Sequence, residues 1–242
     1  MKRILLSLAF AIIAVTVNAQ VNAAKKSSWI DLAATAGNSQ GSIAASYVYS
    51  LNFGARRKLS AGLGARFTTM FGKKVDFTTA PARLARTNAT PFLVVFAGQK
   101  TSNWDTLTVQ RPLVTTINLA ANLGYKLSSN WSLLFNIDLV GLSFGRGSAG
   151  ILTSNGVTRT EPVAKPTRVN ALLTGDLDYG TLNSEFSVKY RFNDKWSGRA
   201  VYQFLFTEYT TTTISQTAPG GISVSRFRNK ANNFGLAIAY EL

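Results

Sequence analysis

The chain has 242 residues, and its 26 Lys and Arg against 11 Asp and Glu give a formal net charge of +15 at pH 7. It contains no cysteine and no histidine, which excludes disulfide bonds, metal sites built on either residue, and Ser-His-Asp or Cys-His catalytic groups. Because no general base or activated nucleophile stands out among the other residues, we predict that the protein is not an enzyme and uses no cofactor.

The N-terminus has the features of a secretory signal peptide. Lys2 and Arg3 precede a mainly apolar run at 4–17, and small residues follow up to Ala19 and Ala23. A basic start, a short apolar run and an alanine at the cleavage site are typical of signal peptides. We therefore predict a signal peptide over residues 1–19, with cleavage after Ala23 as the alternative. A membrane anchor is less favoured, because a spanning helix needs about 17–25 residues.

Apolar residues alternate with small or polar residues along most of the remaining chain. In residues 182–192, for example, Phe186 and Val188 fall on one side, and Glu185 and Lys189 on the other. A period of two is typical of β-strands, and helical spacing is absent. The alternation predicts eight strands, in residues 29–36, 42–53, 59–72, 113–127, 131–145, 181–192, 196–210 and 231–242.

Short and long connections alternate between these strands. The short turns are 54–58, 128–130 and 193–195, and the long connections are 73–112, 146–180 and 212–229. Each short turn predicts a hairpin, with Phe53 opposite Leu59, Leu127 opposite Trp131, and Phe192 opposite Trp196. In all three registers the apolar residues of both strands share one face, as a sheet with one apolar side requires.

Two folds are compatible with strands that have one apolar and one polar face. In a soluble β-sandwich or a lipocalin-like barrel, the apolar face would point inward. In an outer-membrane barrel it faces lipid, and the polar face lines the lumen. The strands exceed the roughly 9–11 residues that cross a bilayer, and short turns alternating with long loops are the layout of such barrels. We therefore predict an all-β fold: an eight-stranded antiparallel transmembrane β-barrel with short periplasmic turns and long extracellular loops.

Aromatic residues gather at the strand ends next to the short turns. Aromatic girdles mark both membrane interfaces of outer-membrane barrels. We predict a periplasmic girdle of seven residues, namely Phe53, Tyr125, Trp131, Tyr190, Phe192, Trp196 and Tyr240.

The signal peptide, the eight alternating strands, the turn at 193–196 and the last strand resemble the small outer-membrane barrels of the OmpA/OmpX type. The resemblance covers about residues 28–242, and it implies the outer membrane of a Gram-negative-type bacterium and insertion by the barrel-assembly machinery. That machinery reads a last strand ending on an aromatic residue; Phe234 and Tyr240 fit this pattern, whereas the final residue is Leu242. We expect no periplasmic domain after the last strand.

One segment leaves the strand number open. Residues 91–98 and 104–110 flank a polar stretch and predict a further hairpin. If both runs crossed the membrane, the barrel would have ten strands. Pro112 interrupts the passage into the following strand, and we therefore favour a hairpin that prolongs the barrel above the membrane.

The alternation also assigns side chains to the two faces. It sends Leu119, Leu123, Phe186, Val188, Phe204 and Leu236 toward lipid. It sends Arg66, Lys126, Asp138, Glu185, Lys189, Arg191, Arg199 and Glu241 into the lumen. Because eight strands leave room only for side chains, we predict an ion-pair network that includes Glu185, Arg199 and one of the other carboxylates and closes the lumen.

Basic residues lie near the expected outer ends of the strands, namely Lys73, Lys74, Arg146, Arg226, Arg228 and Lys230. We predict that they form a collar that binds the phosphates of lipopolysaccharide. A secreted chain without an aromatic-basic platform is not expected to bind nucleic acid. Two functions fit: a structural or surface-interaction role through the long loops, or alternatively a narrow passive pore or transporter of small hydrophobic molecules.

Overall fold

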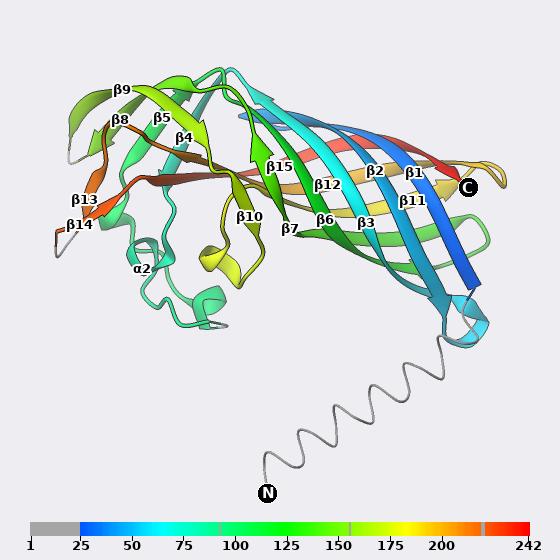
Figure 1. The fold of residues 1–242 in the computed structure, drawn as a ribbon. Coiled ribbons are helices and arrows are strands. Elements are labelled where there is room, and N and C mark those ends of the chain that lie inside the picture. Colours follow the sequence, from blue (N-terminus) through cyan, green and yellow to red (C-terminus); the bar gives the residue numbers. More distant parts are fainter. Residues whose placement is uncertain (1–24, 92, 155, 219–220) are drawn as a thin grey trace, which may run out of the picture.

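The computed structural model describes residues 25–242, apart from residues 92, 155 and 219–220 (Figure 1). The predicted signal peptide therefore lies outside the described residues. The long strands are β1 (Lys25–Ala36), β2 (Gln40–Phe53), β3 (Leu59–Gly72), β6 (Leu113–Lys126), β7 (Trp131–Phe144), β11 (Leu182–Arg191), β12 (Trp196–Thr210) and β15 (Arg226–Glu241). They match the strands that the alternation predicts to within a few residues.

The long strands form a closed ring. β1 pairs with β2 and with β15, and antiparallel pairing continues from β2 through β3, β6, β7, β11 and β12 to β15. An antiparallel sheet that returns to its first strand is a barrel without open edges. The predicted all-β antiparallel fold is confirmed.

The three predicted hairpin registers are also confirmed. Phe53 lies opposite Leu59, and the backbone amides of Leu127 and Phe192 each donate a 2.9 Å hydrogen bond to the carbonyl oxygen of the tryptophan across the turn. Because a slip of one residue would reverse every side chain, these registers fix which residues enter the lumen.

The ring turns its apolar face outward. On β6 the side chain of Leu123 is 56% exposed and its neighbour Asn122 only 8%; on β15 Leu236 is 72% exposed and Ala237 8%. This is the reverse of a soluble sandwich or lipocalin, whose apolar face is its core. The residues predicted to face lipid lie on the outside, with Leu119, Leu123, Phe186 and Leu236 exposed, and Val188 and Phe204 half-exposed.

Shorter strands extend the sheet beyond the ring, at the end opposite the short turns (Figure 1). They are β4 (Lys74–Thr79), β5 (Thr106–Gln110), β8 (Ser148–Ser154) and β9 (Val157–Pro166). β4 pairs with β5, β5 with β8 and β8 with β9, while β4 also pairs with β15 and β9 with β12. A buried apolar cluster fills this extension, including Met70, Val75, Phe77, Leu107, Leu152, Tyr209 and Phe227.

The predicted hairpin of residues 91–98 and 104–110 does not form. Leu93–Phe96 is a 3-10 helix, η2, and Thr101–Asn103 is another, η3, while β5 pairs with β4 and β8 instead. The apolar run at 93–96 does not alternate, so it has no face for a sheet. Its turn is instead held by local bonds, such as that from the amide of Val94 to the carbonyl oxygen of Thr90.

The remaining elements are short. They are η1 (Ala55–Arg57), α2 (Ala82–Ala85), β10 (Val169–Ala171), η4 (Gly175–Leu177), β13 (Gln216–Ala218) and β14 (Ile222–Val224). The segments around α2 and η4 are joined by an ion pair between Arg86 and Asp176. No helix among the described residues has both the length and the apolar character that crossing a membrane requires.

Candidate functional site

A chain of buried ion pairs crosses the middle of the lumen. Arg66 of β3 lies 3.5 Å from Asp138 of β7 and 3.6 Å from Glu185 of β11. Arg199 of β12 lies 3.7 Å from Glu185 and donates a hydrogen bond to Asp31 of β1. None of these five side chains is more than 3% exposed, so the network links five strands and occupies the lumen at this level.

An apolar layer lies on the turn side of this network. Trp29 packs with Val48 and Ala239, and Leu134 packs against them. Two cations lie near the Trp29 ring: Arg199 Cζ is 5.4 Å and Lys189 Nζ is 5.0 Å from the ring centroid. This layer, which we call the septum, separates the buried charges from the turn end of the barrel.

Neutral polar side chains fill the lumen on the loop side of the network. The Gln203 amide oxygen accepts a hydrogen bond of 2.6 Å from Thr35 and one of 3.1 Å from Ser42. Thr207 donates to the amide oxygen of Gln40. Beyond this layer the apolar cluster of the extension begins. The lumen is therefore filled by side chains through successive apolar, charged, polar and apolar layers.

The other predicted lumen residues lie at the turn end. Lys189 donates a hydrogen bond to Glu241, and Arg191 lies 3.8 Å from Asp194. These pairs are partly exposed, and Lys126 is exposed. The structure therefore separates the eight predicted lumen residues into a buried group and a solvated group at the turn end.

The predicted girdle residues lie around this same end. The Trp131 and Tyr190 ring centroids are 4.7 Å apart, and those of Trp196 and Tyr240 5.0 Å apart. Tyr190 also contacts the ring of Phe192. Tyr125, Trp131, Tyr190, Phe192 and Trp196 are exposed on the outside, and Phe53 and Tyr240 are half-buried beside the turns.

No protein-family model and no curated protein matches the sequence. Among solved structures, the neisserial surface protein A is similar over 90% of this chain and 99% of that chain, with 8% identity and a TM-score of 0.37. Ail of Yersinia pestis, in complex with the heparin analogue sucrose octasulfate, is similar over 90% of this chain and 99% of that chain, with 9% identity and a TM-score of 0.35. The toluene transporter TodX of Pseudomonas putida covers 89% of each chain, with 8% identity and a TM-score of 0.23.

The first two of these proteins are small outer-membrane β-barrels, the type that the sequence pattern resembles. The ring of strands, its outward apolar face and the filled lumen are properties of this chain itself.

The predicted basic collar divides into two groups. Arg226 lies 2.8 Å and Arg228 2.9 Å from carboxylate oxygens of Glu208. Arg228 is only 3% exposed, and the Arg226 guanidinium stacks 3.6 Å from the ring of Tyr179. The prediction that these two arginines form an exposed collar is corrected, because the segment around η4 covers them and Glu208 pairs with both.

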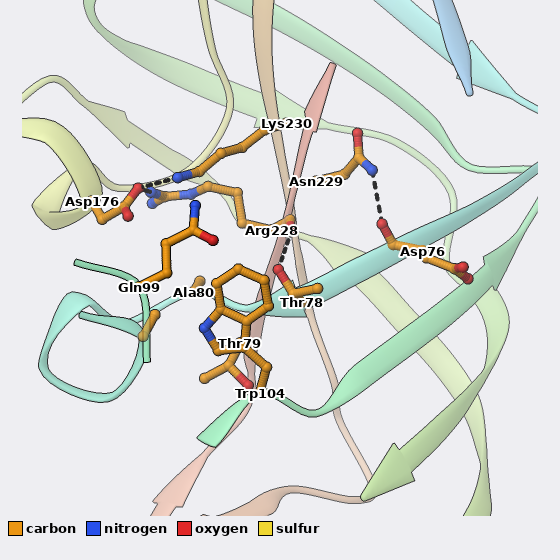
Figure 2. Close-up of a pocket in the computed structure, with 11 residues that line it drawn as sticks. Asp76, Thr78, Thr79, Ala80, Gln99, Trp104, Asp176, Arg228, Asn229 and Lys230 are labelled. Atoms are coloured by element: carbon orange, nitrogen blue, oxygen red, sulfur yellow. Dashed lines mark hydrogen bonds and ion pairs between the residues drawn. The ribbon is translucent and has the colours of Figure 1, made fainter. Parts of the chain in front are cut away.

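Lys230 lies beside this covered group, in a pocket of about 230 Å³ between β15, β4 and the segments around α2 and η4 (Figure 2). It donates to Asp176, which also accepts from Arg86. Burial opposes the charge on Asp176, but the hydrogen bonds and charges of Lys230 and Arg86 outweigh it and lower its pKa. The pocket is therefore lined by internal ion pairs that hold the two loop segments against β15.

Lys73, Lys74 and Arg146 are exposed. The sequence did not single out Arg111, which brings two of them together: its amide donates to the carbonyl oxygen of Lys73, and its own carbonyl accepts from Arg146. Below them on the ring, Phe71 and Phe144 are exposed on the outside. We call Lys73, Arg111 and Arg146 the outer cation patch.

Trp29, Asp31 and Glu208 were also missed. Trp29 and Asp31 follow the alternation of β1, with Ile30 exposed between them. The alternation of apolar and polar residues in that strand is therefore enough to predict that both side chains point inward. Glu208 has the outward parity of β12, and it is buried because the segment around η4 covers it. The sequence holds no local signal for such a long-range cover.

Proposed function

We propose that the ring strands β1, β2, β3, β6, β7, β11, β12 and β15 are the eight strands that cross the outer membrane of a Gram-negative-type bacterium. The exposed apolar face and the aromatic girdle support this number. β4 and β5 do not enter the ring, which argues against ten spanning strands. In this proposal residues 1–19 are the cleaved signal peptide, residues 28–242 form the barrel, and the assembly machinery reads β15.

The protein then has a structural or surface-interaction role, presented by the sheet extension and the loops on the cell exterior. The observation that carries this proposal is the filled lumen, with the Trp29 septum beside the buried pairs of Arg66 and Arg199. A passive pore would need a continuous water path, and eight-stranded barrels have an interior that side chains just fill. No catalytic role is proposed.

Labelling of introduced cysteines in whole cells tests this placement, because the chain has no cysteine of its own. Ser102→Cys lies in the exposed loop of η3, and Asp194→Cys in the short turn before β12. A membrane-impermeant maleimide should label the first in intact cells and the second only after the outer membrane is opened. Labelling of Asp194→Cys in intact cells would contradict the orientation.

The outer cation patch is the proposed contact with lipopolysaccharide. Its three cations stand above exposed Phe71 and Phe144, an arrangement that suits a phosphate group above acyl chains. Cation-to-phosphate hydrogen bonds are about twice as strong as neutral ones. We expect the triple variant Lys73→Gln, Arg111→Gln, Arg146→Gln to lose most of the lipopolysaccharide that purifies with the barrel.

The matched control for that variant is Lys25→Gln, Lys58→Gln, Lys126→Gln, which removes three cations from the turn end. It should retain wild-type amounts of lipopolysaccharide. Equal retention by both triple variants would show that the outer cation patch only interacts with solvent.

A further inference from the structure

The turn end of the lumen opens into a concave basic mouth with a volume of about 570 Å³. Six cations that line it make no ion pair among the described residues, namely Lys25, Lys26, Arg56, Arg57, Lys58 and Lys126. Lys189 and Arg191 also line it, and the carboxylates in the lining, among the described residues, are those of Asp194, Glu241 and the C-terminal Leu242. The mouth therefore concentrates positive charge that the protein itself does not neutralise.

Two of these cations occupy an unusual backbone position. Arg56 has φ of 59° and Arg57 has φ of 52°, in the left-handed region that residues other than Gly, Asn and Asp seldom adopt. Both side chains are exposed at the rim of the mouth. Gly or Asn adopts such a position at less cost, and the turn here carries two arginines instead.

The mouth has an aromatic floor and polar walls. Its floor contains Trp29 of the septum, and Lys189 lies over the Trp29 ring and donates to Glu241 at the edge. Serine and asparagine side chains, including Ser50 and Asn52, supply neutral polar groups along the wall. A molecule that enters this mouth meets donors on its sides and an aromatic ring at its floor.

We propose that the mouth binds a compact polyanion that carries two or more phosphate groups. Six unpaired cations around one small volume match a ligand with several charges at short separation, and phosphates place more charge in that volume than carboxylates do. Arginine binds phosphate oxygens through paired donors, and lysine adds point charges. The phosphates belong either to a soluble polyphosphate or to an anionic phospholipid headgroup. If the turns face the periplasm, as proposed above, both sources reach the mouth.

Titration of the purified full barrel with inorganic pyrophosphate, in a zwitterionic detergent at low salt, tests the site. The variant Arg56→Gln, Arg57→Gln, Lys58→Gln should bind pyrophosphate at least about tenfold more weakly than wild type, because it loses three charge-assisted contacts. The matched control Arg83→Gln, Lys100→Gln, Arg159→Gln removes the same charge from exposed positions outside both the mouth and the outer cation patch, and it should change affinity by less than about twofold.

The variant Lys25→Gln, Lys26→Gln tests the site without altering the turn. It should also weaken pyrophosphate binding, whether or not the turn variant folds. Absence of binding to wild type, equal loss in the charge-matched control, or equally tight binding of a tricarboxylate such as citrate would overturn the proposal. Binding in detergent does not depend on membrane orientation, so these failures would leave the proposed function standing.

Nanodiscs distinguish the two sources of phosphate. In discs of phosphatidylcholine alone, pyrophosphate should bind as it does in detergent. If the ligand is a headgroup, adding cardiolipin should compete and weaken the apparent affinity severalfold. If it is a soluble polyphosphate, cardiolipin should leave the affinity unchanged. Either result supports a phosphate site in the mouth and identifies its source.

Discussion

Replacing Arg199 with methionine is expected to destabilise the barrel by about 3–5 kcal/mol, the usual cost of orphaning a buried charge. The buried network contains two arginines and three carboxylates. Without Arg199, no cation of the described residues lies within ion-pair distance of Asp31, and Glu185 keeps Arg66 alone among them. The free energy of unfolding in urea, measured on barrels in lipid vesicles, gives the loss directly.

Lys189→Met is the control for this variant. The Lys189 pair with Glu241 is partly exposed at the mouth, so its loss should cost about 1 kcal/mol or less. The double variant Arg199→Met, Asp31→Asn should recover part of the stability, because it removes the carboxylate left without a partner. Equal costs for Arg199→Met and Lys189→Met, or no recovery in the double variant, would show that the lumen is wet and the network adds little.

Placing arginine at Leu119 is expected to cost about 2–4 kcal/mol, as for a lipid-facing cation near the bilayer midplane. Leu119 lies on the outer face of β6, well above Tyr125 in the aromatic girdle, and is 42% exposed. The cost arises because the guanidinium would have to remain in hydrocarbon or distort the lipid around it. Urea titration in vesicles measures this loss.

Leu127→Arg supplies the matched comparison. Leu127 belongs to the same hairpin and is similarly exposed, at 48%, but it lies at the turn beside the girdle. A cation near the interface costs only about 0–1 kcal/mol. If both arginine variants were equally stable, the outer face would not lie in lipid, and the membrane assignment of the ring would be wrong.

The barrel wall could be predicted from the sequence because its signal is local and repeated. The alternation in 182–192 sets Glu185 inward and Phe186 outward, and the short turns fix the hairpin registers that carry this parity around the ring. The same rule extends to β1 and includes Asp31, the partner of Arg199 that the sequence analysis did not single out. Which inward charges would meet depends on ring closure between β1 and β15, which no single hairpin reveals.

The loops were less predictable because their contacts are long-range. Glu208 and Arg228 form an ion pair that the segment 172–181 covers. The sequence near either residue contains no pattern that predicts this contact. β4 and β5 contain short alternations, at Val75 and Phe77 and at Leu107 and Val109, that match the apolar cluster of the extension. An alternation over so few residues is a weak indication of a strand, and the sequence does not show that β4 and β5 pair with each other.

Planar-bilayer recording of the wild-type barrel tests the central claim most directly, that the ring crosses the membrane with a lumen filled by side chains. The apolar septum at Trp29 and the buried pairs of Arg66 and Arg199 lie across the lumen. The inserted wild-type protein should therefore pass no steady ionic current, while Arg199→Met, if it inserts, should show openings where the network is broken. A steady open current through the wild-type protein would contradict the filled lumen and favour a passive pore.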